Sequence, residues 1–120
     1  MILDLAHKQL EVFKYSRQLV IECNNLSRQL PLTERFNIIP QINRAALSVI
    51  LNLAEGSSRR SFTERKRFFE ISRGSIVEID TAIQVCLDLN YFTETNLEAI
   101  RPIMISCFKM LSKMMMTQSK

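Results

Sequence analysis

Apolar residues recur at seven-residue intervals through this chain, and this repeat limits the fold more than any other feature. Residues seven positions apart share one face of an α-helix, so each row predicts an amphipathic helix packed along its length. Only two glycines and three prolines occur among 120 residues, which argues against a fold of many strands and turns. The rows are Leu5, Val12, Leu19 and Leu26; Phe62, Phe69, Ile76 and Ile83; and Leu97, Met104 and Leu111. In the second helix, the core seam is Ile42, Ala46, Val49 and Leu53.

Turn residues divide the chain into four predicted helices, at about residues 4–29, 40–55, 62–89 and 95–115. Pro31 ends the first helix, and Pro40 suits the first turn of the second. Gly56 is predicted to cap the second helix in the left-handed conformation. Four helices joined by short links predict one all-α domain over residues 1–120, an up-down-up-down antiparallel four-helix bundle.

Two capping boxes are predicted at helix starts, where a hydroxyl side chain and a Glu three residues later satisfy free backbone amides. Ser61 and Glu64 open the third helix, and Thr95 and Glu98 open the fourth. Pro102 falls inside the predicted fourth helix, so we expect it to bend or loosen the first turns.

Cysteine and histidine usage argues against a metal site or a disulfide framework. Cys23, Cys86 and Cys107 are widely spaced and odd in number, and His7 is the one histidine. We therefore expect buried, reduced thiols, with no metal and no cofactor.

The start of the chain, MILDLAHKQLEV, has an early acid and no basic region before an apolar run, which is not the pattern of a signal peptide. The longest nearly apolar stretch, AALSVILNLA, is too short to span a bilayer. The sequence therefore predicts a cytoplasmic protein without a membrane partner.

The second predicted helix has more apolar surface than one core seam needs. At about 100° per residue, its polar residues share a narrow stripe, while Leu47 and Leu51 fall on a further side, away from the seam. A helix that is apolar over most of its circumference is buried on more than one side. Either the bundle wraps this helix fully or a second subunit covers it, and we favour the second subunit.

Gly74 lies in the middle of the third predicted helix, where glycine costs about 1 kcal/mol relative to alanine. The helical projection places it away from the seam of Phe69, Ile76 and Ile83. Tight packing inside the bundle therefore does not explain this glycine. Something outside the seam is expected to approach its backbone, and a neighbouring subunit is favoured over a ligand.

Charge is distributed unevenly along the chain, whose net charge is +4. Five acids and no base occur between Ser75 and Ile100, whereas basic residues dominate the stretch before it. This segregation predicts one face suited to anionic partners, although pairing of the charges within the fold is an alternative. The basic cluster consists of Arg59, Arg60, Arg65, Lys66 and Arg67.

Several motifs together resemble a known family. QINRAALSVILNLAEG, then RFFEISRGSIVEIDTAI and LDLNYF, are similar to the four-helix-bundle proteins of the 23S rRNA intervening-sequence protein family, which are encoded within bacterial large ribosomal RNA genes. The resemblance covers about residues 10–92 and is strongest at Arg44 to Ser48, Asn52 to Gly56, and Arg73 to Glu78. Asn43, where a second basic residue is common, and Ile50, where a proline is common, depart from the pattern.

The resemblance implies an all-helical bundle that assembles as a homopentamer and has no established enzymatic activity. It also implies a relation to small basic accessory proteins of diversity-generating retroelements, which bind nucleic acid and reverse transcriptases. From the motif and the helical projection, we expect Arg44, Glu55 and Arg73, with Glu78, to form a polar network at a helix or subunit contact. The full set of predicted assembly residues is Arg44, Leu47, Leu51, Asn52, Glu55, Gly56, Arg73, Gly74 and Glu78.

Three functions remain open on the sequence. The favoured one is a non-enzymatic homo-oligomer whose repeated basic cluster binds RNA largely regardless of sequence. A protein-interaction scaffold without direct nucleic-acid binding is the alternative. An enzyme is the least supported, because Glu55 or Glu78 as an acid or base has no nucleophile or base partner in the sequence.

Overall fold

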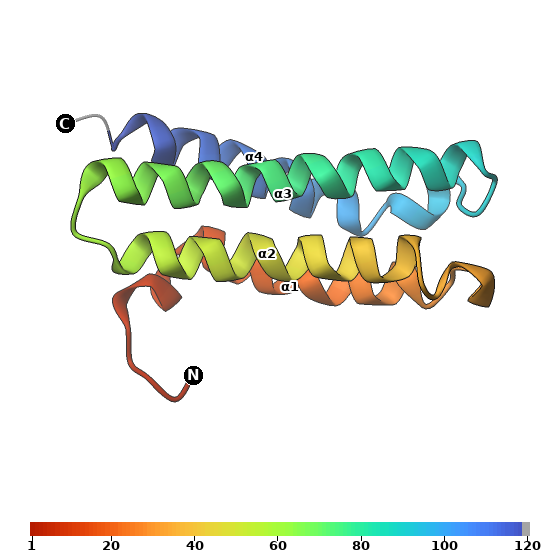
Figure 1. Ribbon diagram of the computed structural model, residues 1–120, viewed down its shortest axis with the longest axis horizontal. Helices are drawn as coiled ribbons and strands as arrows, with labels where there is room; N and C mark the ends of the chain where they lie inside the picture. Colours follow the sequence, from red (N-terminus) through yellow and green to blue (C-terminus); the bar gives the residue numbers. More distant parts are fainter. Residues whose placement is uncertain (119–120) are drawn as a thin grey trace.

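The protein forms four long helices that run along one axis (Figure 1). The computed structural model describes residues 1–118 and contains no strand within them. Consecutive helices pack against each other, and the first also packs against the last, which closes the bundle. The predicted up-down-up-down, all-α bundle is therefore confirmed. Its elements are a 3-10 turn η1 (Ala6–Gln9), α1 (Glu11–Ser27), η2 (Leu32–Glu34), α2 (Ile38–Ser58), α3 (Phe62–Asp88), η3 (Glu94–Leu97) and α4 (Ile100–Met116).

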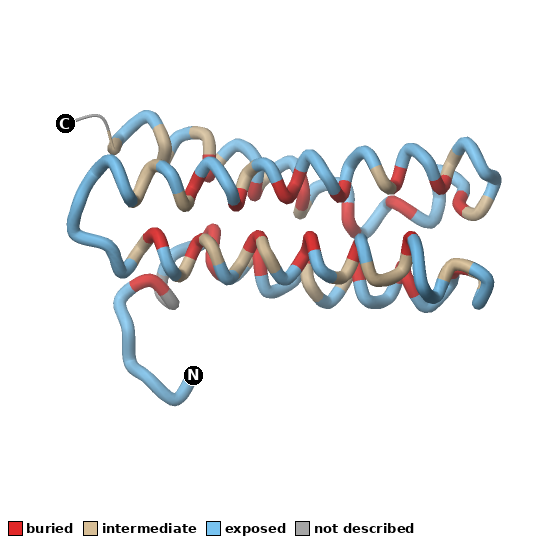
Figure 2. Tube along the Cα trace, in the orientation of Figure 1, coloured by how far each residue is buried: buried red, intermediate tan, exposed pale blue. Residues whose placement is uncertain are grey.

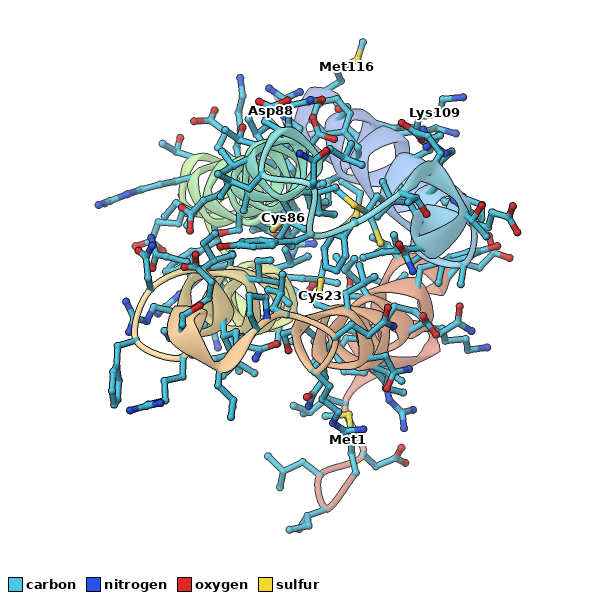
Figure 3. The ribbon with its side chains drawn as sticks, turned by 90° about the vertical axis from the view of Figure 1, so that its right-hand side faces the viewer. Met1, Cys23, Cys86, Asp88, Lys109 and Met116 are labelled. Atoms are coloured by element: carbon cyan, nitrogen blue, oxygen red, sulfur yellow. The ribbon has the colours of Figure 1, made fainter. Side chains whose placement is uncertain are left out.

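The core lies where the inward faces of the helices meet (Figure 2). Most of the predicted rows are buried there, including Leu19, Val49, Phe69 and Leu111, which are fully enclosed. Figure 3, which looks along the bundle, shows Cys23 and Cys86 in the interior, between the helices. All three cysteines are buried and free, as the sequence predicts.

The first helix is shorter than predicted. A 3-10 turn occupies Ala6–Gln9, Leu10 is extended, and α1 begins only at Glu11. The break allows the ring of His7 to pack edge-on against Phe13, with 5.0 Å between the ring centroids. Residues six positions apart on a helix point in directions that differ by about 120°, so an unbroken helix would separate these two rings. Leu5, predicted as a core residue, is consequently exposed.

Gly56 does not cap α2 in a left-handed conformation. The helix continues to Ser58, and neither glycine has a positive φ. Instead, Gly56 is buried against α3: a Cβ atom at this position would lie 2.8 Å from Cε1 of Phe69 and 2.9 Å from Cβ of Phe68. The glycine is required by close packing of two helices, not by the backbone conformation at a helix end.

Small polar residues continue this close contact between α2 and α3. The Ser72 hydroxyl donates to the Val49 carbonyl at 2.6 Å, and the Ser75 hydroxyl donates to Ser48 Oγ at 2.9 Å. These hydrogen bonds fix the positions of the two helices along the bundle axis relative to each other. A shift would leave a desolvated hydroxyl without a partner, which is unfavourable.

The capping predictions are half correct. The Ser61 hydroxyl accepts from the Glu64 amide at 3.2 Å and caps α3, which is one half of the predicted box. Among the described residues, the Glu64 side chain does not accept from the Ser61 amide, so the reciprocal half does not form. The second box, predicted at Thr95 and Glu98, is wrong: Thr93 and Asn96 form it, and they cap η3. Helix α4 then begins at Ile100, so Pro102 occupies its first turn, where a missing amide proton costs no helical hydrogen bond.

Candidate nucleic-acid interface

The basic cluster occupies the turn between α2 and α3 and the first turns of α3, at one end of the bundle (left in Figure 1). Helix α2 ends at Ser58, the backbone becomes extended at Arg59, and Ser61 starts α3. The positive end of the α3 dipole therefore points into the cluster, and it favours anions in the same place as the side chains do.

Arg65 holds this turn in place. Its guanidinium donates to the backbone carbonyls of Ser57 and Arg59, both at 3.1 Å, and its Nε donates to Gln118 at 2.9 Å. It also lies over the ring of Phe69, 5.8 Å from the centroid. With Nε and Nη1 donating to the chain, Arg65 is a structural residue at the α2–α3 turn.

The Arg59 side chain has partners within the chain but remains partly exposed. It forms an ion pair with Glu55 at 3.0 Å, one helical turn earlier, and its guanidinium lies 4.9 Å from the ring centroid of Phe68. Both charged side chains remain about half exposed, at 42% and 56%. A pair this exposed contributes under about 1 kcal/mol, so Arg59 can exchange its carboxylate partner for a phosphate.

Arg60, Lys66 and Arg67 are the free charges of the cluster. Arg60 and Arg67 are exposed and Lys66 is half-buried. Within residues 1–118, none of the three side chains forms a hydrogen bond or an ion pair. The alternative that charges pair within the fold thus applies to Arg59 but not to these three residues.

Acidic groups at the other end of the bundle have partners of their own. Glu94 pairs with Arg101, and Glu34 accepts a hydrogen bond of 2.7 Å from the Tyr91 hydroxyl. That hydrogen bond lowers the pKa of the Glu34 carboxyl and raises the pKa of the Tyr91 phenol. Tyr91 therefore ties the loop after α3 to η2, a contact that the sequence analysis missed because no local pattern pairs residues so far apart in the chain.

The predicted network of Arg44, Glu55, Arg73 and Glu78 does not form within one chain. Arg44 donates to Gln41 at 3.4 Å, Glu55 pairs with Arg59, and Arg73 donates to Ser112 Oγ at 3.0 Å. Arg44 and Glu55 are exposed on α2, and Glu78 is exposed on α3. Asn52, also in the motif, donates to Ser48 on its own helix.

Outward-facing apolar residues remain uncovered on α2. Leu47 is 48% exposed and Leu51 is 54% exposed, so the bundle does not wrap this helix fully. Gly74 on α3 is also exposed, and a Cβ atom there would meet nothing within 4 Å. The structure therefore excludes close packing within the chain as the reason for Gly74.

A second apolar surface, which the sequence analysis missed, is a groove of about 330 Å³ between α3 and α4. Arg73 flanks it, with the guanidinium 5.3 Å from the centroid of the Phe108 ring. The signal was present in the sequence, because Val77, Ile105 and Phe108 fall beside the core seams of their helices. The groove is lined by Ile76, Val77, Asp80, Met104, Ile105, Phe108 and Lys109.

The metal-ligating side chains and the thiols were both named by the sequence as chemically relevant groups. Within residues 1–118, no group of three or more His, Cys, Asp or Glu side chains is placed to hold a metal ion. Burial raises the pKa of Cys23 to about 12 and that of Cys107 to about 11, so these thiols stay protonated at neutral pH and are poor nucleophiles.

A helix crosses a bilayer only if it is long enough and apolar throughout. Over the same residues, none of the helices combines the length and the apolar character that crossing a bilayer requires.

The fold and the cluster define a small antiparallel four-helix-bundle protein with free positive charge at one end. Within that class, the chain belongs to the 23S rRNA-intervening sequence protein family, whose family model matches residues 8–113. The resemblance of the motifs to this family is thereby confirmed over nearly the whole chain. Comparison with curated proteins finds no match. The relation to retroelement accessory proteins rests on the motif resemblance alone.

Proposed function

We propose that this protein is a non-enzymatic, cytoplasmic homo-oligomer that binds RNA through the basic cluster, largely regardless of sequence. The observation that carries the proposal is the set of free charges at one end of the bundle, Arg60, Lys66 and Arg67. Membership of a family named for an intervening sequence of ribosomal RNA supports RNA as the anion.

Phosphate binding by such a cluster depends strongly on salt, because each contact releases condensed counterions from the nucleic acid. One subunit offers three free charges and Arg59, so its affinity alone is weak. Several copies of the cluster, held in one assembly, engage one RNA together and raise the effective affinity without any new type of contact. RNA binding and self-assembly are therefore linked in this proposal.

Self-assembly is supported by two apolar surfaces of the chain, the outward face of α2 with Leu47 and Leu51 and the groove between α3 and α4. The Ser48–Ser75 hydrogen bond fixes the positions of α2 and α3 along the bundle axis relative to each other. Leu47 therefore lies at about the same axial level as Val77, and Arg44 at about the same level as Asp80. If neighbouring subunits are related by rotation about an axis parallel to the bundle, these axial levels are the same in every subunit. The outward face of α2 in one subunit then meets the α3–α4 groove of the next, with leucines on apolar residues and Arg44 opposite Asp80.

A contact of this kind is heterologous, since two different surfaces of the subunit meet, and repeated rotation closes it into a ring. The resemblance implies a ring of five. In this arrangement, Gly74 lies beside the groove, and the neighbouring subunit is the element that approaches its backbone.

The assembly is tested by light scattering and circular dichroism on Leu47→Glu with Leu51→Glu. We expect a smaller subunit number with helicity largely retained. Ile21→Glu is the matched control, because Ile21 is an equally exposed apolar residue on α1, away from both surfaces, and it should leave the assembly intact. A wild-type protein that is monomeric at micromolar concentration would show that the proposed ring does not exist.

RNA binding is tested by fluorescence anisotropy with a labelled RNA oligonucleotide at several salt concentrations. We expect affinity to fall steeply with salt and to drop strongly when Arg59, Arg60, Lys66 and Arg67 are all replaced by glutamine, without loss of the oligomer. The control replaces four exposed cations outside the cluster, so the net charge changes equally; these are Lys14, Arg17, Arg28 and Arg35.

Equal losses in the cluster variant and its control would assign binding to total charge and reject the cluster as the site. No binding by the wild type even at low salt would favour the alternative function, a protein-interaction scaffold. One observation supports that alternative: Leu32 and Phe36, at the end of the bundle opposite the cluster, are 74% and 84% exposed. Large apolar side chains exposed together mark protein contacts more often than phosphate sites.

A further inference from the structure

Phe62 is an aromatic residue that the fold leaves uncovered. The seven-residue row places it in the core with Phe69 and Ile76, but its side chain is 51% exposed. Phe62 is the first residue of α3, directly after the capping residue Ser61. The next residue of the row, Phe69, is fully buried in the core. Bundle packing therefore accounts for Phe69 and not for the exposed ring of Phe62.

The surroundings of Phe62 are positively charged. Arg60 lies two residues before it in the turn, and Lys66 lies four residues after it, on the same face of α3. Both are free charges of the basic cluster. Aromatic rings at this end already accept planar cations, as the stacking of Arg59 on Phe68 shows. Phe62 differs from Phe68 in that no guanidinium covers its ring among the described contacts.

We propose that Phe62 is a stacking platform for an unpaired base, so that the basic cluster binds single-stranded RNA in preference to duplex RNA. Arg60 and Lys66 hold phosphates on either side of the stacked base. An exposed aromatic ring between cations is the combination by which proteins bind single strands without sequence preference, because every base has a π face. This inference rests on the proposed RNA binding and adds the class of RNA.

Duplex RNA offers the cluster its phosphates but hides its base faces within the helical stack. A single strand offers both, so the ring adds affinity only for the single strand. A stacked base contributes roughly 5- to 100-fold in affinity, which is the factor that loss of the ring should remove.

The experiment compares Phe62→Ala with the wild type in anisotropy titrations of a labelled single-stranded RNA of mixed sequence and of its duplex with the complementary strand. We expect about 5- to 100-fold weaker binding of the single strand and unchanged binding of the duplex. Phe36→Ala is the matched control, because Phe36 is also exposed and also lies beside an arginine, Arg35, but at the other end of the bundle. It should change neither affinity.

A second variant reports on stacking directly. The chain contains no tryptophan, so Phe62→Trp places a single indole at the site. Its fluorescence should be quenched by the single strand and not by an equal concentration of duplex phosphate. Circular dichroism and light scattering on both variants test whether they keep the bundle and its subunit number, which we expect.

The outcomes separate this inference from the proposed function. If Phe62→Ala leaves single-strand binding unchanged, or weakens single-strand and duplex binding equally, the stacking platform is rejected while RNA binding by the cluster stands. If the wild type binds neither RNA, the proposed function itself fails, and the platform fails with it.

Discussion

The two glycines of the chain should respond in opposite directions to the same substitution. Gly56→Ala places a Cβ atom 2.8 Å from Cε1 of Phe69 and 2.9 Å from Cβ of Phe68, whereas ordinary contacts begin at 3.4 Å. The new methyl group is therefore about 0.6 Å too close to its neighbour. Phe69 is fully buried, and the Cβ atom of Phe68 is attached directly to the α3 backbone, so neither can swing aside. Helices α2 and α3 have to separate.

The magnitude follows from two opposing effects. Alanine is favoured over glycine in a helix interior by about 1 kcal/mol. Forcing an extra carbon into a well-packed core costs about 1–3 kcal/mol, and the upper end applies here because backbone has to move. The free energy of unfolding of Gly56→Ala should thus fall by about 2 kcal/mol. At Gly74 a Cβ atom meets nothing within 4 Å inside the chain, so only the helix preference acts within one subunit. The free energy of unfolding of the dissociated Gly74→Ala subunit should therefore rise by about 1 kcal/mol.

The assay is urea denaturation followed by circular dichroism, at one fixed protein concentration because assembly contributes to stability. Light scattering is run in parallel, since a neighbouring subunit packed on Gly74 would make Gly74→Ala lower the subunit number. The reasoning about α2–α3 packing is refuted if Gly56→Ala is as stable as the wild type or more stable.

Three further predictions concern single side chains. Arg65→Met should lower the free energy of unfolding by about 1–3 kcal/mol in urea denaturation, since it removes charged donors from two carbonyls; an unchanged midpoint would contradict its structural role. Tyr91→Phe should destabilise the protein at neutral pH, and because the Glu34 pKa is lowered by this hydrogen bond, the difference should vanish as pH falls through that pKa; a pH-independent difference would argue against the bond. Cys23 and Cys107 should resist iodoacetamide near neutral pH until denaturant is added, as mass spectrometry can show, and rapid labelling of the native protein would refute their burial.

The residues of the candidate site could be predicted from the sequence, but which of them are structural and which are free to bind could not. A run of basic residues between two helices is visible in the sequence, so the cluster could be named in advance. Which arginine is structural depends on where the carbonyls of the turn point, and Arg65 reaches those of Ser57 and Arg59 only in the folded chain. The same limit explains Arg73, whose partner Ser112 lies on another helix.

The sequence by itself determined the helices and most of the core, because those properties are local or periodic. Rows such as Leu19 with Leu26, and the Ser61 hydroxyl that caps α3, need no knowledge of other helices. Only the tertiary structure decided how Gly56 is used and where Phe62 lies. The sequence alone does not distinguish a glycine that caps a helix from a glycine that packs under an aromatic ring of a neighbouring helix. It also does not show where along an apolar row the facing helices stop covering the side chains. Those outcomes depend on the distance between the helices and on their relative positions along the bundle axis. Both are set by the packing of all four helices together.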